Sequence, residues 1–211
     1  MAATPNHALQ RTAPGVTAPA PRRPATQEPR RPPQSLSLGS LTERTTFTMH
    51  EIHQNLFIGP QSDYENDVAY QEGWWVVHAA KEPYHRTTVG YSGTDAQPSH
   101  PEYLSARRGN RLMLNLIDAP VEVDIPRAIY DTALAFVHEG LLSGSRVLIH
   151  CQQGVSRSAS VGLLYLRHHT NKVQTDTYPK AEELYNNIYP SYNPGKAIRY
   201  FLRSHWHEYG V

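Results

Sequence analysis

Residues 146–158 read RVLIHCQQGVSRS, and this stretch predicts a strand, a tight loop and a helix in direct succession. The apolar run 147–149 predicts the strand, and the apolar run 159–166, which follows the loop, predicts a buried helix. Cys151, the only cysteine of the chain, stands at the carboxyl end of the strand, and five residues separate it from Arg157. The loop therefore begins at a thiol and ends at a guanidinium group.

The backbone of this loop is suited to hold an anion. The N–H groups from Gln152 to Arg157 can curl around one point, and the N-terminus of the following helix directs its positive end there. Such a ring of donors binds a tetrahedral dianion and favours negative charge on the sulfur of Cys151. Gly154 allows the turn without a Cβ, and Arg157 offers a planar fork to two phosphate oxygens. An inert buried cysteine in a strand-to-helix turn is the alternative interpretation.

The motif resembles the signature of the cysteine-dependent protein tyrosine phosphatase superfamily, which is His-Cys, five residues, Arg, and then Ser or Thr. The ending GVSRS and the following SVGLLYL are most similar to the dual-specificity branch. The resemblance covers about residues 52–207 and includes LFIG at 56–59 and ELYNNIYPSYNPGKAIRYFL at 183–202. It implies a metal-independent, cysteine-based phosphoric monoester hydrolase, with no cofactor.

The resemblance also implies roles for the residues of the motif. Cys151 is the nucleophile, Ser158 donates a hydrogen bond to its sulfur, and His150 orients the loop. An ordinary serine in the first turn of a helix is the alternative for Ser158. The residues implied to bind the substrate phosphate are Gln152, Gln153, Gly154, Val155, Ser156 and Arg157.

Asp118 is the expected general acid. It directly follows the predicted strand 111–117, RLMLNLI. It stands 33 residues before Cys151, which is about the separation found in the dual-specificity branch. Because parallel strands end at the same edge of a sheet, Asp118 and Cys151 should lie close together. A solvated turn residue is the alternative for Asp118. Of the rival acids, Asp124 is better explained as a helix cap, and Asp131 falls inside a predicted helix.

The chain from residue 49 to residue 211 alternates between predicted strands and helices. The predicted strands are 52–58, 74–80, 111–117 and 147–149, and the predicted helices are 63–73, 124–142, 159–166, 180–188 and 195–207. Asp124 is the expected N-cap of the helix through residue 142, with Pro126 in its first turn. The alternation predicts an α/β fold with a mostly parallel central sheet flanked by helices.

Residues 81–110 depart from the pattern of the dual-specificity branch, because the connection is longer than in compact members. It is expected to be a long irregular loop. One interpretation makes it a wall of the substrate cleft, with Arg86, Arg107 and Arg108 available for phosphate or acidic groups. The other makes it an elaborated surface loop.

Residues 1–48 form a separate region by composition, with eight of the seventeen prolines, six arginines and two acidic residues. Such a segment buries too little apolar surface to offset its ordering, so a disordered tail is expected beside a catalytic domain at 49–211. A partner-docking tail, a transit peptide and a functionless extension before a natural start at Met49 are the alternatives.

The whole-chain composition narrows the functional classes. A net charge of +1 gives no reason to expect a nucleic-acid partner, and no apolar run is long enough to span a membrane. A single cysteine suits a reducing compartment, so the cytoplasm is expected. The twelve histidines show no metal-ligand pattern, so no metal is expected. The oligomeric state stays open.

Together these features predict a phosphoprotein phosphatase acting on phosphotyrosine, with phosphoserine and phosphothreonine as further substrates. A phosphatase for a non-protein phosphoester, such as a phosphoinositide, a phosphoglycan or an RNA 5′-phosphate, is one alternative. A phosphate-binding interaction module with little turnover is the other.

Overall fold

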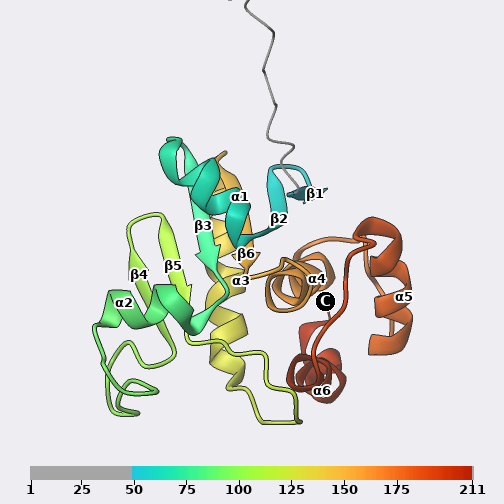
Figure 1. Cartoon of the computed structure of the whole chain (residues 1–211). Helices are drawn as coiled ribbons and strands as arrows, with labels where there is room; N and C mark the ends of the chain where they lie inside the picture. Colours follow the sequence, from blue (N-terminus) through green and yellow to red (C-terminus); the bar gives the residue numbers. More distant parts are fainter. Residues whose placement is uncertain (1–48, 211) are drawn as a thin grey trace, which may run out of the picture. The chain divides into compact units, whose positions relative to one another are not determined.

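The structure is a computed structural model and describes residues 49–210. The segment 1–48, for which the composition predicts a disordered tail, lies outside the described residues, as does Val211. The coloured part of the ribbon in Figure 1 corresponds to the described part of the chain.

A six-stranded sheet forms the centre of the fold, with the strand order β1-β2-β6-β3-β5-β4 (Figure 1). The strands are β1 (His50–His53), β2 (Leu56–Pro60), β3 (Trp74–His78), β4 (Ser105–Arg108), β5 (Arg111–Leu114) and β6 (Arg146–Cys151). Neighbours among β2, β6, β3 and β5 are parallel, whereas β1 and β4 pair antiparallel at the two edges. The predicted α/β class with a mostly parallel central sheet is confirmed.

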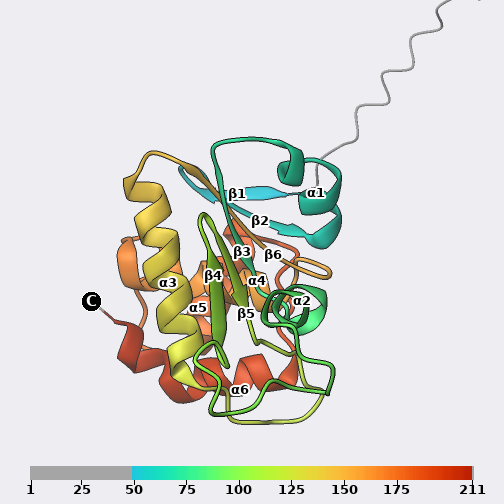
Figure 2. The ribbon, with the colours of Figure 1, turned by 90° about the vertical axis from the view of Figure 1, so that its left-hand side faces the viewer.

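Helices cover both faces of this sheet. The helices are α1 (Gln61–Asn66), α2 (Arg86–Val89), α3 (Arg127–Leu142), α4 (Arg157–His169), α5 (Tyr178–Ile188) and α6 (Lys196–His205). Shorter helical turns are η1 (Val68–Tyr70), η2 (Lys81–His85) and η3 (Trp206–Tyr209). Helices α3 and α4 pack directly on strands, and α5 and α6 lie beyond α4 (Figures 1 and 2). Helix α1 contacts β2 and β6.

The central strand β6 is buried on both faces, so its side chains enter two cores alternately. Val147, Ile149 and Cys151 belong to the larger core, which also contains the buried faces of α3, α4, α5 and α6. Leu148 belongs to the smaller core, together with Tyr64 of α1. The sulfur of Cys151 is therefore directed to the α4 side of the sheet.

The first predicted strand, 52–58, is wrong because it spans a turn. Strands β1 and β2 form an antiparallel hairpin, and Asn55, with φ 61°, lies between them. Asparagine tolerates this left-handed conformation because its short polar side chain can bond locally. Apolar residues on both sides of the turn made the two strands look continuous.

Asp124 does not cap the helix that follows it, which corrects that prediction. Helix α3 begins at Arg127, and its N-cap position is held by Pro126, with φ −57° and ψ 121°. Ile125 precedes a proline, and the proline ring disfavours the helical conformation at that residue. The proline therefore delays the start of the helix beyond the reach of Asp124.

Residues 81–110 are not one irregular loop, as the sequence suggested, because they contain η2, α2 and the edge strand β4. The Arg107 guanidinium lies 2.7 Å from a carboxylate oxygen of Glu139, and Arg108 is paired with Glu102. Arg86 is paired with Glu82. These three arginines are therefore engaged in ion pairs within the segment or with α3.

Candidate active site

The segment between β6 and α4 closes into the loop that the sequence predicts. Strand β6 ends at Cys151 and helix α4 begins at Arg157, so the two residues occupy the two ends of the loop. The Cys151 side chain is 2 % exposed, and the Arg157 side chain is buried as well. The helix N-terminus, with its unpaired N–H groups, lies at the end of the loop and favours an anion there.

The carbonyl groups of the loop are bonded from outside it. Those of Gln152 and Val155 accept hydrogen bonds from the backbone N–H groups of Gln61, at 3.3 Å, and Asn193, at 2.8 Å. The carbonyl of Gly154 accepts a bond of 3.1 Å from the Tyr189 hydroxyl. In a planar trans peptide the N–H group points opposite to the C=O group. The N–H groups that follow these carbonyls therefore point away from the Gln61, Asn193 and Tyr189 donors.

Gly154 is required by both conformation and space. Its φ is 80°, a region that residues with a Cβ rarely adopt. A Cβ at this position would also lie 2.9 Å from the carbonyl carbon of Gly59 and 3.0 Å from the nitrogen of Pro60. The loop therefore packs directly against the end of β2, and glycine permits that approach.

Arg157 is held at the base of the loop by two hydrogen bonds. Its Nη2 donates to Oε1 of Gln152 at 2.7 Å, and its Nη1 donates to the carbonyl oxygen of Leu116 at 3.3 Å. Its Nε is buried and has no hydrogen-bond partner among the residues that the structure describes. The guanidinium therefore keeps donor capacity beyond its protein contacts.

The Ser158 side chain lies beside the sulfur of Cys151. The Ser158 hydroxyl lies 3.2 Å from Sγ of Cys151 and 3.2 Å from the carbonyl oxygen of Gly154. The side chain is fully buried in the first turn of α4. A hydroxyl has one proton, so it can donate to the sulfur or to the carbonyl, but not fully to both.

Asp118 and Cys151 line the same open cavity, of about 710 Å³, together with Arg157. The rival acids are elsewhere. Asp124 lines a different cavity beside α3, and Asp131 is bonded to Arg127 and to the Tyr209 hydroxyl. Of the three candidate acids, Asp118 is thus the one that shares a cavity with the thiol.

A wall of this cavity comes from a segment that the sequence analysis did not assign to the site. Its residues are Asn193, Pro194, Gly195 and Lys196. None of the residues that line the cavity comes from 81–110, which was one predicted wall. The signal that could have revealed the segment is an Asn-Pro-Gly turn directly before the strongly amphipathic helix α6.

The His150 side chain lies on the face of the sheet opposite to the Cys151 side chain, beside Tyr64. Its Nε2 lies 2.6 Å from Nδ1 of His78. Its ring stacks on the Tyr64 ring, with 4.9 Å between the ring centroids and 5° between the ring planes. Burial first, and then the neighbouring His150 and Arg111, lower the pKa of His78 to about 2. Burial, with a smaller contribution from Arg157, lowers the pKa of His150 to about 3. Both rings are therefore neutral near pH 7, which suits a positioning role rather than proton transfer.

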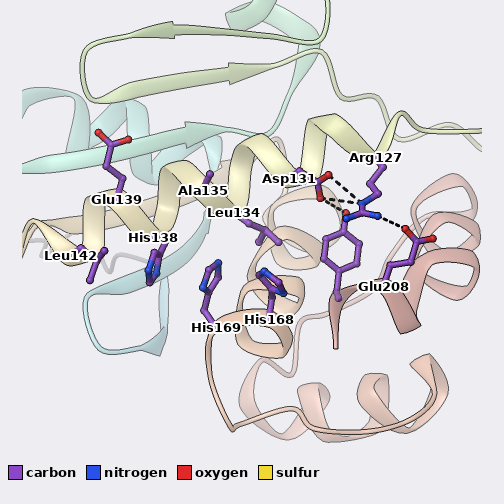
Figure 3. Close-up of a pocket in the computed structure, with 11 residues that line it drawn as sticks. Arg127, Asp131, Leu134, Ala135, His138, Glu139, Leu142, His168, His169 and Glu208 are labelled. Carbon is purple, nitrogen blue, oxygen red and sulfur yellow. Dashed lines mark hydrogen bonds and ion pairs between the residues drawn. The ribbon is translucent and has the colours of Figure 1, made fainter. Parts of the chain in front are cut away.

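A second cavity, of about 520 Å³, lies between α3 and α4, and His138, His168 and His169 are among the residues that line it (Figure 3). The rings of His138 and His169 stack, with 4.3 Å between the ring centroids and 11° between the ring planes. Burial, followed by His138 and His168, lowers the pKa of His169 to about 4. Within residues 49–210, no group of three or more His, Cys, Asp or Glu side chains is arranged to hold a metal ion.

Comparisons with known proteins find sequence relatives, although no protein-family model matches the chain. Dual specificity protein phosphatase 12 of Mus musculus is 26% identical over 149 residues, which are 68% of this chain and 42% of that protein. Dual specificity protein phosphatase 8 of Mus musculus is 27% identical over 151 residues, 71% of this chain and 20% of that protein. The aligned segment thus spans less than half the length of each relative.

Solved structures show the same fold. Human DUSP28, as a point variant, has a TM-score of 0.52 and 20% identity, with 76% of this chain and 94% of that chain covered. The human tyrosine phosphatase-like serine/threonine/tyrosine-interacting protein has a TM-score of 0.51 and 20% identity, and the match covers 76% of this chain and 97% of that chain. The described part of the chain therefore has the α/β fold of these structures. The sequence relatives are dual specificity protein phosphatases, so the chain is similar to the dual-specificity branch of the cysteine-dependent protein tyrosine phosphatase superfamily.

Proposed function

We propose that this protein is a phosphoprotein phosphatase that hydrolyses phosphotyrosine, phosphoserine and phosphothreonine through a cysteinyl-phosphate intermediate. The observation that carries the proposal is the cavity that holds Cys151, Arg157 and Asp118 together. A nucleophile, an anion-binding group and an acid are the three parts that a phosphomonoester hydrolase of this kind needs.

In the first step, the N–H groups of residues 152–157 and the Arg157 guanidinium hold the substrate phosphate. The Cys151 thiolate forms a bond to phosphorus in line with the leaving oxygen, and the P–O bond breaks. Asp118 gives its proton to the leaving oxygen, so the product departs as an alcohol or a phenol. The negative charge that develops is met by backbone dipoles and by Arg157, so the scheme needs no metal.

In the second step, a water molecule attacks the phosphorus of the cysteinyl-phosphate. The Asp118 carboxylate takes a proton from that water, and the S–P bond breaks. Inorganic phosphate leaves and the thiolate is restored, with Ser158 donating a hydrogen bond to the departing sulfur. Asp118 returns to its protonated state, so the cycle is balanced.

One assay tests this proposal as a whole. Hydrolysis of para-nitrophenyl phosphate in the presence of a metal chelator should release phosphate at a rate proportional to the protein concentration. No release above the background would favour the phosphate-binding module instead. That alternative has some support, because one protein of similar fold is by name phosphatase-like and interacting. The presence of Cys151, Arg157 and Asp118 in one cavity favours the enzyme.

Replacing Ser158 with alanine should slow the breakdown of the intermediate more than its formation. The variant loses the O–H group that lies 3.2 Å from the sulfur. We expect breakdown to slow roughly tenfold, which corresponds to about 1.4 kcal/mol and is within reach of a hydrogen bond to a charged group. Stopped-flow mixing should then reveal a burst of para-nitrophenol before the steady state.

Ser160→Ala is the matched control for this prediction. Ser160 is a buried serine of the same helix, and its hydroxyl lies 3.2 Å from the Tyr192 hydroxyl rather than near the sulfur. It should show no burst and an unchanged steady-state rate. Identical kinetics for the two alanine variants would contradict a role for Ser158 in the breakdown of the cysteinyl-phosphate.

Phosphopeptides should be better substrates than a soluble phosphoinositide. The five loop residues between Cys151 and Arg157 carry no charge, so the loop offers cationic groups for one phosphate only. The arginines of 81–110 do not line the cavity, and Lys196 adds a single cation to its wall. We expect a higher kcat/KM for phosphotyrosine and phosphothreonine peptides than for the inositol compound.

The measurement is kcat/KM for the three substrates under one set of conditions. A preference of about tenfold or more for the phosphoinositide, which is about 1.4 kcal/mol of transition-state binding, would overturn the substrate assignment. It would leave the Cys151 chemistry in place, because the nucleophilic step is common to all phosphomonoesters.

We further propose that residues 49–211 are the catalytic domain and that the proline- and arginine-rich segment 1–48 is a tail outside it.

The single cysteine supports a reducing compartment, the cytoplasm, where a reactive thiolate persists. No helix within residues 49–210 combines the length and the apolar character needed to cross a membrane. Phosphoprotein is the proposed partner, with no role for nucleic acid or membrane.

A further inference from the structure

Gly195 lies directly against the carboxylate of Asp118. A Cβ built on Gly195 would be 1.9 Å from Oδ1, 2.7 Å from Cγ and 3.1 Å from Oδ2 of Asp118. The φ and ψ of Gly195, −66° and 170°, are open to every residue. A side chain at this position would therefore displace the Asp118 carboxylate, whereas the backbone conformation is open to any residue.

The backbone around Gly195 is fixed to the loop that holds Cys151. The Gly195 N–H donates to Oγ of Ser156 at 2.9 Å, and the Asn193 N–H donates to the carbonyl oxygen of Val155 at 2.8 Å. Two hydrogen bonds to successive loop residues prevent this segment from moving away independently. The segment beside Asp118 is therefore held in a fixed position relative to the loop that begins at Cys151.

The position of Asp118 depends on packing rather than on bonding. No hydrogen bond or ion pair to its carboxylate is found within residues 49–210, and the side chain is exposed. The neighbouring Ala119 is tied to the same segment, since its carbonyl oxygen accepts a bond of 3.4 Å from the Ala197 N–H. The backbone of the acid segment is thus held near α6, and the carboxylate lies in the space that Gly195 leaves.

We infer that Gly195 is a positioning residue for the acid. The space left by its missing side chain sets where the Asp118 carboxylate lies relative to the thiol. This inference rests on the proposed function, because it assigns Gly195 a part in the protonation of the leaving group. Gly195 acts through Asp118 and touches no reacting atom in this scheme.

The inference can be tested without damaging the fold. The atoms that a Cβ at Gly195 would displace are the exposed end of a flexible side chain, so rotation of Asp118 relieves the clash. At Gly154 the same Cβ would meet backbone atoms of β2 instead. Gly195→Ala should therefore leave the melting temperature nearly unchanged while moving the carboxylate.

The experiment compares Gly195→Ala with the wild-type protein on a series of aryl phosphates. For substrates with poor leaving groups we expect kcat to fall by about 10²-fold, the scale for a catalytic group displaced by about 1 Å. For substrates with very good leaving groups, which need no proton, the loss should almost disappear. Alkylation of Cys151 by iodoacetate should keep its wild-type rate, because the thiol is not altered.

Two further variants separate this role from a general structural one. In an Asp118→Asn background, Gly195→Ala should cause no additional loss, because the group it positions is already inactive. Gly93→Ala is the matched control, because Gly93 does not line the cavity. Its φ is not in the left-handed region, and a Cβ there would lie 3.7 Å from the carbonyl oxygen of Asp95, which is an ordinary contact. This variant should leave kcat unchanged for every leaving group.

Three results would overturn the inference: wild-type kinetics in Gly195→Ala, an equal loss for good and poor leaving groups, or a further loss in the Asp118→Asn background. Inactivity of the wild-type protein would instead count against the proposed function. In that case a crystal structure of Gly195→Ala still decides the inference, because an unmoved Asp118 carboxylate would contradict it and a rotated one would support it.

Discussion

Cys151→Ser should abolish turnover while largely preserving the binding of phosphate to the loop. A serine hydroxyl does not ionise near neutral pH even among the dipoles of this loop, whereas a thiol can. The backbone N–H groups and the Arg157 guanidinium are unchanged by the substitution, so the anion site remains. The measurements are kcat for para-nitrophenyl phosphate and the dissociation constant of inorganic phosphate, by calorimetry, for both proteins.

The reactivity of the wild-type thiol provides the control for this result. Iodoacetate should alkylate Cys151 rapidly near pH 6, and bound phosphate or vanadate should protect it, because both anions would occupy the loop. Since Cys151 is the only cysteine, the incorporated label reports on this site alone. Alkylation as slow as that of a free thiol would contradict the activated thiolate, and residual turnover in Cys151→Ser would contradict the nucleophile.

Asp118→Asn should lower kcat by roughly 10²–10⁴-fold with a modest change in KM, the usual scale for the loss of a positioned acid. An amide of the same shape fills the space beside Gly195 but has no proton to give to the leaving oxygen. The loss should shrink for phosphates with very good leaving groups. Steady-state kinetics on aryl phosphates of graded leaving-group pKa measure both effects.

Asp124→Asn is the matched control for this prediction. Asp124 is an exposed aspartate in the same connection between β5 and α3, and it lines a different cavity from Asp118. Its replacement should leave kcat close to that of the wild-type protein. A large loss in Asp124→Asn combined with a small one in Asp118→Asn would show that the acid is misassigned.

The centre of the site was predictable because it is local in sequence. A strand, a loop and a helix within residues 146–169 place Cys151 and Arg157 at the ends of one turn, whatever the rest of the chain does. Asp118 needed one further rule, that the carboxyl ends of parallel strands meet at one edge. The register of the sheet obeys it, since β3 pairs in parallel with both β5 and β6.

The outer parts of the site were not predictable by the same means. Gly195 is 44 residues from Cys151 along the chain, and nothing in the periodicity of α6 reveals that it lies against Asp118. The start of α3 was missed for a local reason, because Pro126 decides the helix boundary and the capping preference of Asp124 does not. For the arginines of 81–110 two interpretations stayed open, because the sequence does not show which acidic residues pair with Arg107 and Arg108.

The bonds from Asn193 and Gly195 to Val155 and Ser156 also affect how the domain opens. Because Asn193 and Gly195 directly precede helix α6, we expect the start of this helix and the loop to open as one cooperative unit in native-state hydrogen exchange. An anion that orders the loop must then add its binding free energy to the cost of opening α6. The exchange rates of the slowest amides of α6 should therefore fall when an anion occupies the Cys151 loop, although most residues of that helix do not line the cavity.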